Sequence, residues 1–152
     1  MLALIRADSI NLPLFLHVLG AMLLVGALAF VGILILLGWR SSDRSVALTR
    51  LALRAIPYGV LPAYVLMRVG AQWTEAEWDY PENFDPAWIG IGYVTADAGA
   101  LLLLVSIVLA VIGLRKLRAG GGLGLGRAVG VISLVLVAAY VVAIWAMTAK
   151  PG

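Results

Sequence analysis

Four long apolar runs, separated by three short polar segments, dominate the pattern of hydrophobic and polar positions along this chain of 152 residues. The runs cover residues 12–37, 46–69, 87–114 and 128–148. Each reaches the roughly 20 residues that a helix needs to cross ~30 Å of hydrocarbon. Because every backbone amide must be paired inside a bilayer, four such runs predict an all-α bundle of four transmembrane helices.

The composition agrees with this interpretation and limits the chemistry. Hydrophobic residues make up 63% of the chain and charged residues 12%, about half the charged fraction of a soluble protein. Residues 1–152 therefore form a single membrane domain, and 12–37 is too long for a signal-peptide core, so we expect it to be retained. Cysteine is absent, which excludes disulfides and thiolate metal sites. The sequence also lacks a Ser–His–acid set, a carboxylate pair within a span and a zinc motif, which favours a non-enzymatic role.

The charged residues differ in sign from one polar segment to the next. Segments 38–45 and 115–127 are basic, whereas 70–86 carries five acids and no base. Lys and Arg accumulate on the cytoplasmic side of membrane proteins. The sequence thus predicts a bacterial plasma (inner) membrane protein with segment 70–86 and both termini outside. Anionic lipid headgroups account for the basic segments, so we expect the lipid bilayer, and no nucleic acid, as their partner.

The run 46–69 is irregular and carries polar side chains. Pro57 and Pro62 lie within it, and each removes a backbone hydrogen bond and is expected to kink the helix. At 100° per residue, four polar side chains fall on one face. This stripe consists of Arg54, Tyr58, Tyr64 and Arg68. Since an arginine that faces lipid costs about 2.5 kcal/mol or more, we expect the stripe to face the bundle interior or a wet cavity.

The run 87–114 has two contrasting faces. One is a stripe of small residues suited to close helix packing, and Asp97 lies nearly opposite it. The stripe consists of Gly92, Ala96, Gly99, Ser106, Ala110 and Gly113. Counted from the basic segments, Asp97 and Arg68 lie at a matching depth of ~27 Å. They are expected to form an intramembrane ion pair, and the alternative is a proton-responsive site, because intramembrane ionisable groups often mark pathways.

His17 is the only histidine of the chain. It is expected to be a bonded structural residue, to handle protons, or to bind a metal. As a ligand it would act with a thioether, from Met22, Met67 or Met147, on Cu(I) or on haem iron. Met22, five residues along the same helix, has a poor spacing for this. The sequence favours no cofactor and leaves haem or copper open.

Two short motifs resemble known membrane proteins. Residues 14–21 (LFLHVLGA) and 145–151 (WAMTAKP) are similar to the first and last spans of small bacterial four-helix integral membrane proteins of unknown function. More loosely, the first-span histidine resembles that of copper-resistance-D-type and cytochrome-b-like membrane proteins. The closer resemblance implies a four-helix membrane fold and no particular activity, and the looser one implies haem or copper on His17.

Three functions follow from these observations. The leading hypothesis is a non-enzymatic accessory or scaffold subunit of a larger membrane complex, or a homo-oligomer. The second is an electron or metal carrier that uses His17 and a methionine. The third is a small proton-coupled transporter that uses Asp97 and Arg68, since transporter sites often lie where helices are interrupted.

Overall fold

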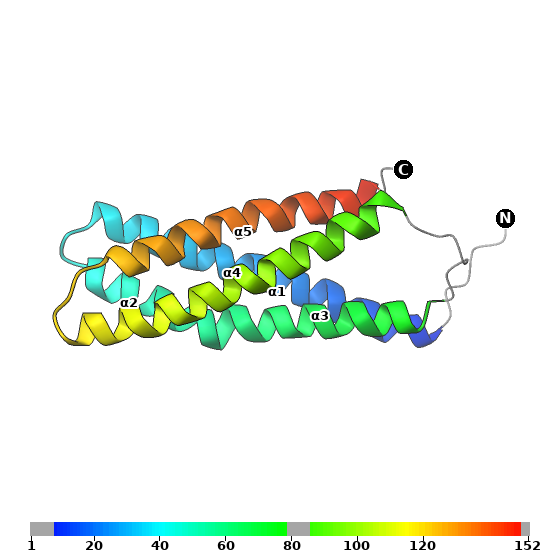
Figure 1. Cartoon of the computed structure of the whole chain (residues 1–152), viewed down its shortest axis with the longest axis horizontal. Helices are drawn as coiled ribbons and strands as arrows, with labels where there is room; N and C mark the ends of the chain where they lie inside the picture. The colour runs from blue at the N-terminus through cyan, green and yellow to red at the C-terminus, as the bar shows by residue number, and fades with distance from the viewer. Residues whose placement is uncertain (1–7, 79–85, 150–152) are drawn as a thin grey trace.

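The computed structural model describes residues 8–78 and 86–149, which are almost entirely helical and contain no strand. Figure 1 shows an elongated bundle whose helices run along one long axis. The elements are α1 (Asp8–Arg40), α2 (Ser45–Ala55), the π-helical turn η1 (Ile56–Val60), α3 (Leu61–Ala76), α4 (Ala87–Arg118) and α5 (Gly124–Ala149). The predicted all-α class is confirmed for this part of the chain.

Three helices are long and apolar enough to cross a membrane, with spans of Ser9–Arg40, Ala87–Arg118 and Gly124–Ala149. They contain the first, third and fourth predicted runs. The second run, 46–69, is helical throughout but is divided among α2, η1 and α3. The π-helical turn includes Pro57, which has no N–H for the usual helical bond. The kink that we expect at the two prolines stays a prediction.

The helices are longer than predicted, so the polar segments are shorter. The assignment of 70–86 to a loop was wrong at its start, because α3 continues to Ala76 through residues that favour helix, such as Ala71 and Gln72. Residues 79–85, with the remaining acids of that segment, lie outside the described residues. The two basic segments reduce to residues 41–44 and 119–123, and Gly120 permits the second turn with a φ of 76°.

Packing divides the end of the bundle near the start of α4 into two helix pairs. α3 packs against α1, and α4 packs against α5, while α1 also contacts α5 along the bundle. Near the start of α4, Figure 1 shows a wide separation between the α1–α3 pair and the α4–α5 pair. All six members of the predicted small-residue stripe of α4 are buried. Among them, Gly99 faces Tyr140 of α5, and Gly113 faces Leu53 of α2.

α1 and α3 cross with their backbones in direct contact. A Cβ atom added to Gly20 would collide with the backbone of Met67, and one added to Gly70 would collide with the backbone of His17. Small residues at such crossings allow helix backbones to approach closely. The two glycines therefore fix the spacing and register of α1 against α3.

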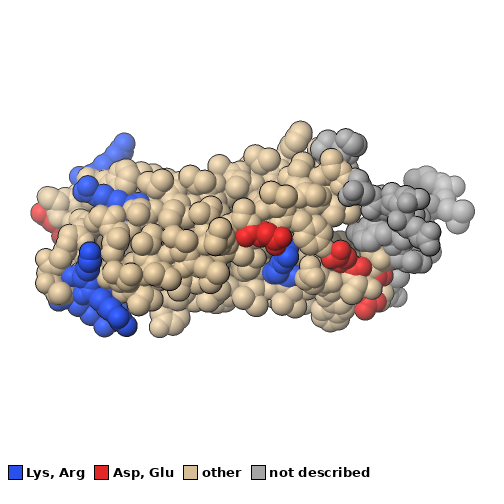
Figure 2. All heavy atoms as spheres, in the orientation of Figure 1, with Lys and Arg blue, Asp and Glu red and all other residues tan. Residues whose placement is uncertain are grey.

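Charge is separated along the long axis of the bundle. Figure 2 shows Lys and Arg gathered at one end, where α1 joins α2 and α4 joins α5 (Figure 1), with acidic atoms among them, and further acidic side chains toward the other end. The basic end includes Arg40, Arg115, Lys116 and Arg118 at helix termini. Between the two ends, the same view shows acidic and basic side chains side by side along the body of the bundle.

Candidate functional site

A cavity of about 330 Å³ opens between the two helix pairs, on the side of the molecule away from the basic end. α1, α3, α4 and α5 all contribute to its lining. Most lining residues are apolar or aromatic, and the aromatic ones are Trp78, Trp88, Tyr93 and Tyr140. The polar ones are His17, Arg68, Thr74 and Glu75. A mostly apolar cavity with a few polar groups is the usual form of a small-molecule site.

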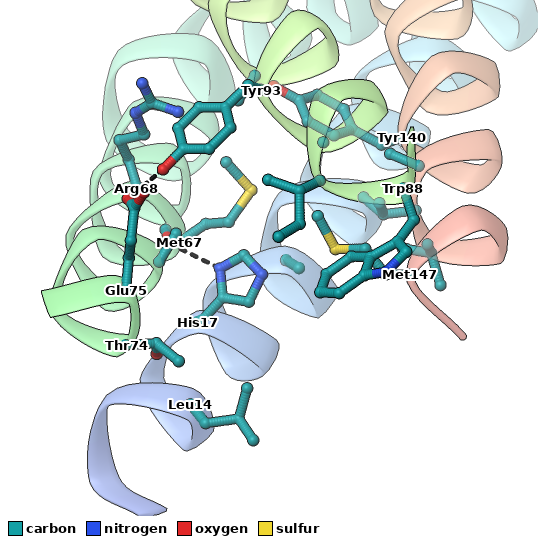
Figure 3. Close-up of a pocket in the computed structure, with 18 of the residues that line it drawn as sticks. Leu14, His17, Met67, Arg68, Thr74, Glu75, Trp88, Tyr93, Tyr140 and Met147 are labelled. Atoms are coloured by element: carbon teal, nitrogen blue, oxygen red, sulfur yellow. Dashed lines mark hydrogen bonds between the residues drawn. The ribbon is translucent and has the colours of Figure 1, made fainter. Parts of the chain in front are cut away.

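His17 is held on the cavity wall by one hydrogen bond. Its Nδ1 lies 2.9 Å from the carbonyl oxygen of Met67 on α3. A carbonyl can only accept, so Nδ1 carries the proton and donates it. In the neutral ring, Nε2 is consequently an acceptor, and it has no hydrogen bond among the described residues. Figure 3 shows this nitrogen on the side of the ring that faces Trp88 and Met147.

The backbone contact between α1 and α3 determines where this imidazole lies. Gly70 touches the backbone of His17 itself, and Gly20, one helical turn further along α1, touches that of Met67. His17 is therefore close enough to α3 to reach a main-chain carbonyl. Such a bond fixes both the tautomer and the orientation of the ring, as it does for histidines that bind metals.

Two of the three candidate thioethers line the same cavity, those of Met67 and Met147. Met67 is 5% exposed, and Met147 reaches across to α4, where its Cε lies 2.5 Å from a Cβ added to Gly92. Met22 is 68% exposed and does not line the cavity. The structure thus brings His17 together with Met67 and Met147, and it contradicts Met22 as a partner.

Polar side chains bridge α3 and α4 along one side of the cavity. Nη2 of Arg68 lies 2.9 Å from Oδ1 of Asp97, so the two residues expected to pair are in contact. The Arg68 guanidinium also lies over the Tyr93 ring, 5.4 Å from its centroid. The Tyr93 hydroxyl donates to Glu75. Both charged side chains of α3 that line the cavity therefore have a bonding partner on α4.

Two side chains of the predicted polar stripe contact α4 or the cavity, and the other two are exposed. The Tyr64 hydroxyl donates to the carbonyl of Ala96 at 3.1 Å, and Arg68 lines the cavity. Tyr58, in contrast, is 82% exposed, and Arg54 is exposed as well. The expectation that all four side chains face inward was wrong for these two, because the bundle packs on the opposite side of α2 and η1, through residues such as Leu53 and Ile56.

The Arg68–Asp97 pair lies at the surface of the bundle, with side-chain exposures of 29% and 66%. Exposed ion pairs contribute little, since water screens them and both side chains lose freedom. In a double-mutant cycle of Arg68→Gln and Asp97→Asn, we expect a coupling energy of at most about 1 kcal/mol. Detergent unfolding of the four proteins measures it. A coupling of about 3 kcal/mol would instead mean that the pair is shielded from water.

Glu75, Tyr93 and Tyr140 line the cavity, although the sequence did not predict them as site residues. Glu75 follows Arg68 by seven residues and so continues the same helical face, but it was assigned to a loop. Tyr93 precedes Asp97 by four residues, which places both on one side of α4. Nothing in the sequence pattern distinguishes Tyr140 from an ordinary core aromatic residue.

The described residues contain no group of three or more His, Asp or Glu that could hold a metal ion. A metal at this site would thus depend on the imidazole and the thioethers. Comparisons with protein families, with curated proteins and with solved structures find no match to this chain.

Proposed function

We propose that this protein is a non-enzymatic accessory subunit of the bacterial plasma membrane that binds a small ligand in the cavity beside His17. It would cross the membrane four times, with both termini outside, and assemble with itself or within a larger complex. The observation that carries the proposal is His17, whose Nδ1 donates to Met67 and whose Nε2 faces a mostly apolar cavity.

Two observations support four spans and this orientation. The helical residues 45–76 extend for roughly 48 Å at 1.5 Å per residue, enough to cross the hydrocarbon even with an interrupted helix. The basic side chains gather at one end, which the positive-inside rule assigns to the cytoplasm. His17 then lies roughly 34 Å of helix above Arg40, near the outer boundary of the hydrocarbon.

An electron or metal carrier is the second candidate, and the two thioethers of the cavity favour it. Imidazole with thioether sulfur is a soft donor set that suits Cu(I). A His–Met pair also ligates haem iron in some cytochromes. In either case Nε2 of His17 would bind the metal, with Met67 or Met147 as the sulfur ligand, and the bond to the Met67 carbonyl would orient the ring.

A proton-coupled transporter built on Asp97 and Arg68 has less support. Arg68 lines the cavity, but Asp97 does not, and its side chain is 66% exposed on the outside of the bundle. A carboxylate that moves protons with a substrate would be expected to line the route that the substrate takes.

The first test is to identify what the protein retains when it is extracted with its own lipids. Wild type and His17→Ala are compared by absorption spectra, air-oxidised and dithionite-reduced, by metal analysis and by mass spectrometry of released small molecules. We expect a ligand in wild type whose occupancy falls at least about tenfold in His17→Ala, because a half-buried bonding partner is lost. Met22→Ala, on the exposed side of α1, is the matched control and should retain it.

The result also separates the two candidates. A released organic molecule with no metal supports the ligand-binding subunit. A Soret band, or copper at one equivalent that is lost in His17→Ala, supports the carrier. If wild type and His17→Ala retain the same molecules in the same amounts, the proposed site is wrong.

A further inference from the structure

We propose, on the basis of the ligand-binding function above, that the cavity takes the hydroquinone head of a lipid-soluble quinol. The hydrogen bond that the site offers to a ligand has a defined direction. Because Nδ1 of His17 donates to the Met67 carbonyl, neutral Nε2 can only accept. An organic ligand must therefore present an O–H or N–H donor to it. A hydroquinone has such a donor, whereas the oxidised quinone has only acceptor oxygens.

The charges around the cavity are already paired. Among the described residues, the charged side chains that line it are Arg68 and Glu75. Arg68 is paired with Asp97 at 2.9 Å, and Glu75 accepts the hydroxyl of Tyr93. An anionic or cationic ligand would have to compete with these partners and would place its own charge in a mostly apolar cavity, at a cost in free energy. The site consequently favours a neutral molecule.

The cavity is small and its lining is mostly apolar. A volume of about 330 Å³ lies at the lower end of the range for small-molecule sites and suits a single ring. Trp88 and Tyr140 lie on the wall that faces His17 (Figure 3), and aromatic side chains stack on rings in offset or edge-to-face arrangements. Polar solutes, such as sugars or amino acids, would find too few bonding groups here.

The packing of the helices leaves a ligand a route into the cavity from the lipid phase. α3 packs on α1 and α4 packs on α5, and α3 and α4 are joined beside the cavity by the side-chain bonds of Tyr64, Arg68 and Tyr93. An apolar tail can pass between α3 and α4, which are joined only through side chains there, more easily than between helices in backbone contact. Trp78 and Trp88 line the cavity as well, at the level where Trp is enriched in membrane proteins. The geometry points to a ring held on His17 with its tail in the bilayer.

The test measures binding of decylhydroquinone and of decylquinone to the full chain in lipid nanodiscs, by titration calorimetry under anaerobic conditions. We expect the hydroquinone to bind about tenfold more tightly than the quinone, because the quinone leaves Nε2 without a donor. His17→Phe keeps an aromatic ring but removes the acceptor, and it should bind both forms equally. Equal affinities in wild type, or a preference that survives in His17→Phe, would overturn the proposal.

A second pair of variants leaves the histidine unchanged. Ala143 lines the cavity and is 5% exposed, so Ala143→Leu should fill part of the space and weaken hydroquinone binding at least about tenfold. Ala138→Leu makes the same change on an exposed face of α5 and should leave binding unchanged. If both bind hydroquinone as wild type does, the ligand lies elsewhere and the proposal fails.

The failure of this proposal and that of the proposed function have different signatures. If neither decyl compound binds but Cu(I) or haem does so in a manner that requires His17, the hydroquinone is wrong and the cavity still serves as a ligand site. If binding of the decyl compounds, Cu(I) and haem is in every case unaffected by His17→Phe and by Ala143→Leu, both proposals are wrong.

Discussion

Gly20→Ala is expected to destabilise the protein by about 3 kcal/mol, at the upper end of the usual cost of overpacking. The added methyl group would collide with the main chain of Met67 on α3. A backbone cannot rotate away as a flexible side chain can, so the two helices must separate along their contact. Unfolding in mixed micelles of increasing SDS fraction measures the loss. Gly70→Ala, which would collide with the main chain of His17, is expected to have a similar effect.

Gly26→Ala is the matched control on the same helix, because a Cβ at Gly26 would meet nothing within 4 Å. It should be neutral or slightly stabilising, since alanine favours helix over glycine by up to about 1 kcal/mol. If Gly20→Ala and Gly26→Ala behave alike, α1 and α3 do not cross in backbone contact. The same result would also count against His17 as the ligand-binding residue, since that contact brings His17 within 2.9 Å of the Met67 carbonyl.

The sequence predicted the positions of the apolar helical runs better than their ends. Glycine explains two of the errors. Gly70 was interpreted as the end of a span, but it lies inside α3, where it allows the approach of His17. Gly126 was assigned to the polar segment 115–127, but it lies inside α5, where an added Cβ would collide with Thr49. A glycine that ends a helix and one that permits a close crossing have the same local sequence signal, and only the tertiary contact distinguishes them.

The candidate site was predictable where it depended on helix geometry alone. Equal depth predicted that Arg68 and Asp97 would meet, and helical spacing predicted that Asp97 would lie opposite the buried small residues of α4. The bond from His17 to Met67 could not be predicted, because it depends on which two glycines meet. The glycines of α1 recur every six residues, at Gly20, Gly26, Gly32 and Gly38, so they scatter around the helix and none stands out.

The exposed positions of Tyr58 and Arg54 have a different explanation. The polar stripe was expected to avoid lipid, but α2 and η1 bury the opposite side, which includes Leu53 and Ile56 at 0% exposure. Packing of large apolar side chains thus determines the rotation of this segment about its axis, which places the polar residues on the exposed side. Arg54 lies only four residues, roughly 6 Å, from Arg50, so its long side chain can reach the headgroup region from a lipid-facing position.

Leu53→Ala is the prediction that tests this rotation, and it is expected to cost about 3 kcal/mol, within the range for truncation of a buried leucine. Leu53 is 0% exposed, and its Cδ1 lies 3.0 Å from a Cβ added to Gly113 of α4, so the truncation leaves a cavity between two helices. Leu51→Ala removes the same atoms from a side chain that is 49% exposed on α2, and it should cost less than about 1 kcal/mol. SDS unfolding of the two variants measures the difference.

Equal losses, or a larger loss for Leu51→Ala, would mean that α2 presents its other face to the bundle. Tyr58 and Arg54 would then point inward, as the sequence alone suggested.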